Sequence, residues 1–168
     1  MLPHEEAWDL KPENGHVNAQ SLLIESYYWD CVDENSPLGS DTGADILSFY
    51  SKAITSDREL DPVKFIESTL ESWEMLIDDW SLSDEASIKQ RMVDDPHTIR
   101  VSNEAVIALA FAMYVMHGDV DPRIRDMAII AVDRESTQAL LAEWCSARER
   151  SERLADFRYK LTQMRETR

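Results

Sequence analysis

The sequence predicts a mainly α-helical, single-domain bundle around a buried apolar helix at residues 102–117, preceded by an irregular arm at residues 1–16. Apolar residues recur at spacings of three and four over most of the chain, and no alternating stretch typical of a strand exceeds a few residues. Residues 105–116 are apolar without interruption, which is typical of a helix in the middle of a core. With 168 residues, 43% of them hydrophobic, the chain can bury a core of its own. We therefore expect one domain over residues 17–168.

The segment after the arm is the least clearly patterned. Residues 17–30 carry leucines and tyrosines at helical spacing, although the closing aromatics would also suit a strand. We expect a helix there. Residues 35–43 contain one proline and two glycines and are predicted to form a loop. Ser40 or Asp41 can then cap a helix to about Ile54, because a short side-chain oxygen satisfies free backbone N–H groups.

The next helix carries a stronger start signal. Asp61 is a natural N-cap and Pro62 a natural first helical residue. The apolar residues that follow have spacings of four, three, four and three, which predicts one buried stripe on a helix that reaches residue 80. The stripe consists of Ile66, Leu70, Trp73, Ile77 and Trp80. A shorter helix is expected over residues 84–93, before Pro96.

The central helix and its successor are marked by caps at both ends. Ser102 is expected to cap a helix over residues 103–117, and Gly118 can end it in the left-handed conformation. Asp121, followed by a proline, repeats the cap-then-proline signal and starts a helix through Ala131.

The last helix is expected to be long. Asp133 can cap it, and apolar residues at helical spacing continue to about residue 165. Arg148–Glu152, Glu149–Arg153 and Asp156–Lys160 form i,i+4 pairs on its polar face, each worth about 0.2–0.5 kcal/mol.

The charge of the chain is large and one-sided. It has 33 acidic and 17 basic side chains, a formal net charge of −16, and all of the excess lies in residues 1–99, which hold 22 acids and 6 bases. This argues against direct binding of nucleic acid, which needs clustered Lys and Arg, and against an anionic membrane surface. Solubility alone is one explanation. A basic protein partner is the other, and the asymmetry favours it.

The cellular location is predicted to be the cytoplasm. Cys31 and Cys145 lie far apart and outside any metal-binding motif, so we expect free, partly buried thiols in a reducing compartment. Residues 1–9 carry acids where a signal peptide needs bases, and they lack an apolar segment. The uncharged run at residues 105–116 is too short to span a bilayer.

An acidic stripe on the predicted helix after Asp61 is the main candidate for a binding surface. Its members have spacings of four, three and four, and such like-charge pairs destabilise a helix by about 0.2–0.5 kcal/mol each. The stripe consists of Glu67, Glu71, Glu74 and Asp78. Asp79 extends it, and Trp80 is a candidate aromatic anchor. A solvated face without function is the alternative.

A second group of carboxylates surrounds the loop at residues 35–43. Asp30, Asp33, Glu34 and Asp41 are expected to add to the partner-binding surface. Asp45 lies one helical turn beyond Asp41. These carboxylates could instead hold a hard cation, which prefers several oxygen ligands, or act as acid and base. The spacing matches no EF-hand loop. The alternative is a purely structural role, in which these carboxylates cap the following helix or lie in a solvated loop.

Other chemistry is poorly supported. The sequence has no GxGxxG, P-loop, HExxH or GxSxG motif, so we expect no cofactor, no metal site and no catalytic residue. His117, at a helix C-terminus, is interpreted as structural.

Three short segments carry a family resemblance. They are His16-Val17-Asn18-Ala19, Tyr28-Trp29-Asp30-Cys31-Val32-Asp33-Glu34 and Ser36-Pro37-Leu38-Gly39-Ser40-Asp41-Thr42-Gly43. They resemble a small family of bacterial proteins of unknown function, in which an aromatic residue is expected where this chain has Leu38. The resemblance covers about 30 residues and implies a bacterial origin but no activity. The C-terminal half resembles other small helical bacterial domains, some of them encoded beside toxin genes.

Three functions follow from these features. The first is a protein-binding inhibitor, of the kind represented by bacterial immunity proteins, that docks a basic toxin such as a nuclease through the acidic surface. The alternative is a non-catalytic regulatory or adaptor module that uses the helix at 133–165 as a partner seam. The third is a metal-dependent enzyme that uses the carboxylates at 30–45.

Overall fold

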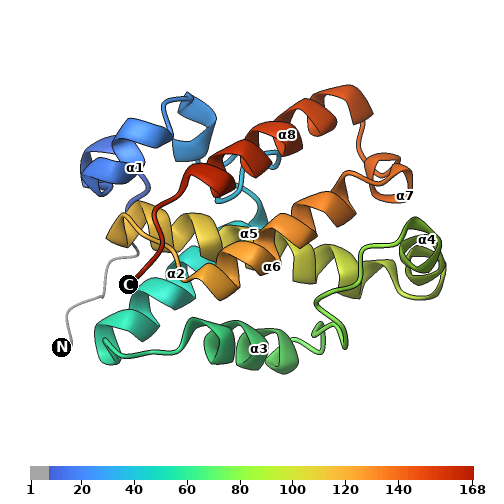
Figure 1. The fold of residues 1–168 in the computed structure, drawn as a ribbon, viewed down its shortest axis with the longest axis horizontal. Helices are drawn as coiled ribbons and strands as arrows, with labels where there is room; N and C mark the ends of the chain where they lie inside the picture. Colours follow the sequence, from blue (N-terminus) through green and yellow to red (C-terminus); the bar gives the residue numbers. More distant parts are fainter. Residues whose placement is uncertain (1–7) are drawn as a thin grey trace.

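The computed structural model describes residues 8–168, and in this part of the chain it contains helices and no strand (Figure 1). The predicted class, a mainly α-helical bundle, is confirmed. The α-helices are α1 (Val17–Leu22), α2 (Asp41–Ser56), α3 (Pro62–Ser72), α4 (Glu85–Asp94), α5 (Pro96–His117), α6 (Pro122–Glu135), α7 (Gln138–Leu141) and α8 (Ala147–Gln163). Two 3₁₀ turns, η1 (Pro12–Asn14) and η2 (Ser26–Trp29), precede α2.

Helix α5 is the centre of the bundle. It packs most extensively against α6 and α2, and α1, α3 and α4 also contact it (Figure 1). Every residue from Ala105 to Val115 is buried. By length and composition α5 could cross a membrane, but 78% of its most apolar 18-residue window is buried inside the fold, as in the core helix of a soluble protein.

Helix α5 begins earlier than the sequence analysis predicted. Asp95 is its N-cap, accepting from the Thr98 N–H, and Pro96 is its first residue. Ser102 is therefore not a cap. It lies inside the helix, fully buried, and its hydroxyl donates to the carbonyl of Met75. The predicted end is confirmed, because Gly118 ends the helix with a φ of 74°.

Helix α3 ends earlier than predicted, at Ser72. The N–H of Met75 donates to the carbonyl of Leu70 (2.8 Å), and the N–H of Glu74 donates to that of Glu71 (3.0 Å). These two bonds form a Schellman motif, which satisfies the last carbonyls of the helix and turns the chain away. The predicted helix through residue 80 is wrong, and residues 73–83 form a turn-rich connection to α4.

The expected long C-terminal helix is divided. Asp133 lies inside α6, where its carboxylate pairs with Arg158 at 2.9 Å, so it is not a cap. The short helix α7 follows, and Ser146 caps α8 by accepting from the Glu149 N–H. The prediction of one helix from residue 133 is therefore wrong, whereas the predicted end near 165 agrees with α8.

The N-terminal segments cover one end of the bundle. The helix expected over 17–30 is present only as α1 and η2, with an irregular stretch between them. Of the predicted arm, residues 1–7 lie outside the described residues, and residues 8–16 are irregular apart from η1. The expectation of partly buried thiols is wrong, because Cys31 and Cys145 are both exposed.

Candidate functional site

The predicted acidic stripe is only partly a helical face. Glu67 and Glu71 lie four residues apart on α3, and their carboxylates form no hydrogen bond or ion pair with residues 8–168. Glu74 follows the helix and is exposed, with a backbone φ of 59°. We call these three residues the glutamate stripe.

The remaining members of the predicted stripe have structural partners. Asp78 pairs with Arg91 at 2.6 Å. Asp79 accepts from the Ser81 hydroxyl (2.6 Å) and N–H (2.9 Å), which lowers the pKa of the Asp79 carboxyl. Trp80 is half-buried against the core, so it is not the free anchor that the sequence analysis expected. These residues fold the turn between α3 and α4.

An aromatic pair lies on the other flank of α3. Trp73 packs against Phe49 of α2 with ring centroids 6.1 Å apart, and Phe49 remains 40% exposed. Because each residue advances about 100° around a helix, Trp73 is turned about 200° from Glu71. The glutamate stripe and the aromatic pair therefore flank the helix on different sides.

The carboxylates around the loop at 35–43 divide into two groups. Asp30 accepts from the N–H groups of Val32 (2.9 Å) and Asp33 (3.2 Å). Asp33 accepts from the Asn35 N–H and pairs with Arg153 of α8 at 3.0 Å. Both side chains hold the loop together, so they are not free for a partner.

The second group, Glu34 and Asp41, lines a polar cavity of about 390 Å³. Glu104 of α5 also lines it, and burial raises the pKa of the Glu104 carboxyl. Asp41 is the first residue of α2, whose N-cap is Ser40 (Oγ accepts from the Gly43 N–H at 3.0 Å). This cavity brings together two of the four predicted residues.

A metal centre at 30–45 finds no support in the geometry. Within residues 8–168, no three His, Cys, Asp or Glu side chains are grouped so that they could hold an ion. Asp45 is exposed on α2 and does not join Asp30 or Asp33.

A buried ionic network ties α5, α6 and α8 together. Glu135 accepts from the amide of Asn103 at 3.1 Å and pairs with Arg150 at 3.5 Å. Burial raises the pKa of the Glu135 carboxyl against the opposing attraction of Arg150. Arg134, which is fully buried, donates to Asn103 (2.7 Å) and to the carbonyl of Trp80 (3.0 Å). The network fixes the turn after α3 to the core.

The C-terminal helix does not offer the partner seam that an adaptor module would need. Leu154, Phe157 and Leu161 of α8 are fully buried in the core of the bundle. Tyr159, 57% exposed, points outward. The apolar face of this helix is thus covered by the chain itself.

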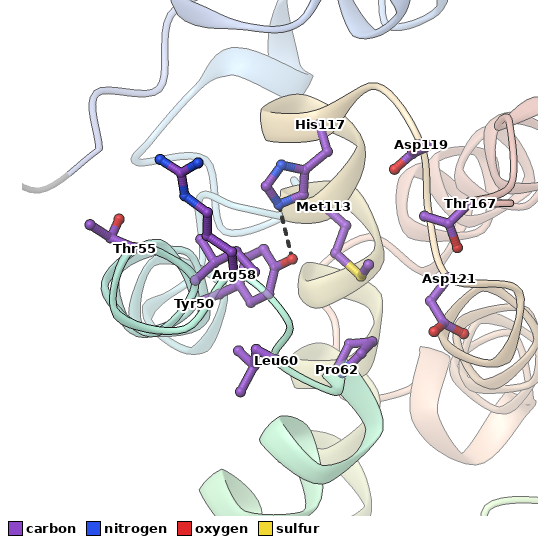
Figure 2. A pocket seen from close by; sticks show the side chains of 11 residues that line it. Tyr50, Thr55, Arg58, Leu60, Pro62, Met113, His117, Asp119, Asp121 and Thr167 are labelled. Carbon is purple, nitrogen blue, oxygen red and sulfur yellow. Dashed lines mark hydrogen bonds between the residues drawn. The ribbon is translucent and has the colours of Figure 1, made fainter.

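A second hollow lies at the end of the bundle where α2, α3, α5 and the C-terminal tail meet (Figure 2). Its volume is about 590 Å³, within the range of small-molecule sites. The Tyr50 hydroxyl and the His117 Nε2 atom form a hydrogen bond of 3.0 Å at its centre. Asp119 and Asp121 line one side and Arg58 the other (Figure 2). We call this hollow the Tyr–His cavity.

Both central groups of the Tyr–His cavity are held in their neutral forms. Burial, with the negative charges of Asp119 and Asp121, raises the pKa of Tyr50 to about 12. Burial lowers the pKa of His117, although Asp119 opposes this. At neutral pH the cavity therefore presents an uncharged phenol and imidazole to the acidic side chains opposite.

Sequence reasoning missed this cavity and interpreted His117 as a structural residue. The sequence does contain one sign of the cavity, because His117, Asp119 and Asp121 occur at every second position directly after the apolar run. The other half of the cavity comes from residues 50–62. The spacing of residues 117–121 does not show that these two segments meet in the fold.

The fold and these features define a helical-bundle protein with an acidic stripe on one helix and a polar, partly apolar cavity at one end. No family model matches the sequence, and no solved structure matches it. Over 137 residues, 80% of this chain, the sequence is 31% identical to the uncharacterized protein YfeS of Escherichia coli (strain K12). The chain spans 56% of the length of that relative. The similarity assigns no activity.

Proposed function

We propose that this protein binds and neutralises a basic protein partner, in the manner of a bacterial immunity protein, and that the glutamate stripe on α3 and the turn after it is the docking surface. The observation that carries the proposal is the contrast among the acidic side chains of residues 8–99. Asp61, Asp84 and Asp95 cap helices, and Asp33 and Asp78 pair with arginines. The three stripe glutamates have no such internal role.

The stripe is also placed where a partner can reach it. Helix α3 lies at the periphery of the bundle (Figure 1) and buries only one face, through Ile66 and Leu70. Glu71 and Glu74 are exposed. Opposite charge on a partner would steer encounter and raise the association rate, with a steep dependence on salt. Phe49 and Trp73, on the other flank of the helix, could supply apolar contact area to a partner that wraps around it.

Association kinetics test the proposal. The partner to try first is the product of the reading frame next to this gene, if it encodes a basic domain. We expect Glu71→Lys/Glu74→Lys to slow its association about tenfold or more at low salt, and to abolish rescue of cells that express it. The matched control is Glu13→Lys/Asp45→Lys, which changes the net charge equally at exposed residues elsewhere.

Two results would count against the proposal. If the stripe variant and the control variant slowed association equally, the effect would be one of net charge and not of a docking surface. If neither changed the rate or its salt dependence, the glutamate stripe would not contact the partner.

A further inference from the structure

The Tyr–His cavity is lined by residues from three stretches of the chain, 50–62, 113–121 and Thr167, and it combines apolar with polar surface. Ile54, Leu60, Pro62 and Met113 provide apolar walls. The polar atoms converge on one region, where the Tyr50–His117 hydrogen bond faces Asp119 and Thr167 (Figure 2). A mostly apolar hollow with a few convergent polar groups is the usual form of a small-molecule site.

The charge at the centre of this cavity is negative. Asp119 forms no ion pair within residues 8–168, whereas Asp121 pairs at 2.8 Å with Arg123, which also pairs with Asp61. The Asp119 charge acts on both central groups, since it raises the pKa values of Tyr50 and His117. Arg58 is exposed and lies on the opposite side of the cavity from Asp119 (Figure 2).

The segments that form the cavity are held in place independently of any ligand. Gly118 is left-handed and lies against the ring of His16, so the chain turns directly after His117. The N–H of Val120 donates to the carbonyl of Arg165 (2.9 Å), and the N–H of Thr167 donates to that of Val120 (3.0 Å). These bonds fix the C-terminal tail beside Asp119, and the polar groups are thus positioned in advance.

We propose that the Tyr–His cavity binds a small primary ammonium ion that carries an apolar group. The ammonium donates to the Asp119 carboxylate and to the Tyr50 oxygen, and its apolar group packs on Leu60, Pro62 and Met113. A neutral imidazole at His117 is compatible with this, because a protonated ring would repel the ligand. This site is separate from the glutamate stripe, and the proposal does not depend on the proposed function.

Calorimetric titration with benzylamine tests this proposal, with benzyl alcohol as the neutral probe of the same shape. We expect saturable binding of benzylamine and much weaker binding of benzyl alcohol. Asp119→Asn should weaken benzylamine binding about tenfold to a hundredfold, the value of a hydrogen bond between charged groups. The control Asp45→Asn removes one charge from an exposed residue of α2 outside the cavity and should leave binding unchanged.

N-acetyl-lysine methylamide identifies the source of the ammonium group. Tighter binding of this probe than of benzylamine would indicate a lysine side chain of a protein, and the reverse would indicate a free amine. Both results support the cavity as an ammonium site. Absence of benzylamine binding, equal binding of benzyl alcohol, or unchanged binding to Asp119→Asn would each overturn the proposal. Amide chemical shifts of residues 117–121 report whether each variant keeps the native fold.

Discussion

Glu74 occupies a position where glycine is the usual residue, and this makes its substitution a sharp test of the structure. It is the one residue other than glycine with a positive φ within residues 8–168. The left-handed conformation costs a residue with a side chain about 1–2 kcal/mol. Glycine does not have this cost. However, it loses more conformational entropy on folding, and this offsets the gain by about 0.5–1 kcal/mol. We therefore expect Glu74→Gly to stabilise the protein by about 0.5–1 kcal/mol.

The assay is urea and thermal unfolding of Glu74→Gly beside Glu74→Ala. The carboxylate of Glu74 lies at the C-terminus of α3, where the helix dipole disfavours negative charge. Both variants remove that charge, but alanine keeps the strained backbone, so the difference between them isolates the strain. For a domain of this size, about 0.5–1 kcal/mol corresponds to a rise in Tm of about 1–4 °C for glycine over alanine.

If the alanine variant proved as stable as the glycine variant, Glu74 would not be strained at that position. Glu74→Asn adds a further check, since asparagine tolerates the left-handed region better than most residues. It should fall between the other two. A glycine variant that is more stable but associates more slowly with a basic partner would show that the strained glutamate is kept for binding and not for folding.

Three further predictions test other parts of the structure. Arg150→Met should cost about 3–5 kcal/mol in urea unfolding, because it leaves the buried Glu135 carboxylate without its cationic partner. The double variant with Glu135→Met should be more stable than this single one, and additive losses would contradict the pairing. The lowered pKa of His117 means that its contribution to stability is complete above its ordinary value of 6.5 and is lost as the pH falls through the folded-state value. An NMR titration of the His117 ring should therefore show a midpoint below 6.5, and removal of the ring should flatten this part of the pH–stability curve. Gly118→Ala should lower the free energy of unfolding by about 1–2 kcal/mol or more, because the residue is left-handed and a Cβ there would lie 2.0 Å from Nδ1 of His16. His16→Ala in the same chain should recover part of that loss.

The helix starts were the most predictable part of the fold, because their signal is local. Asp61 and Asp121, each followed by proline, cap α3 and α6 as expected. Asp95 carries the same signal before Pro96 and is the cap of α5, whereas the predicted cap was Ser102. That serine lies inside α5 because the helix already begins at Pro96. Its hydroxyl donates to the carbonyl of Met75, a distant partner that no local pattern reveals.

The helix ends were harder to predict, because tertiary contacts decide them. The apolar period continues from Ile66 to Trp80, but a Schellman motif without glycine stops the helix at Ser72. Arg134 of α6 then holds the turn by donating to the carbonyl of Trp80. Apolar spacing reports which residues are buried, and the chain can bury them without remaining helical.

The charge of the chain has more than one physical origin, and the structure separates them. An aspartate can reach a backbone N–H two or three residues ahead, and this geometry explains Asp30, Asp57, Asp61, Asp79, Asp84 and Asp95. Glutamate has a longer side chain and makes such local bonds less readily. The aspartates therefore contribute to the net charge as a consequence of how the helices begin and turn. The glutamates of α3 have no such explanation, and their mutual repulsion costs stability. It is this uncompensated part of the charge, and not the total of −16, that argues for a basic partner.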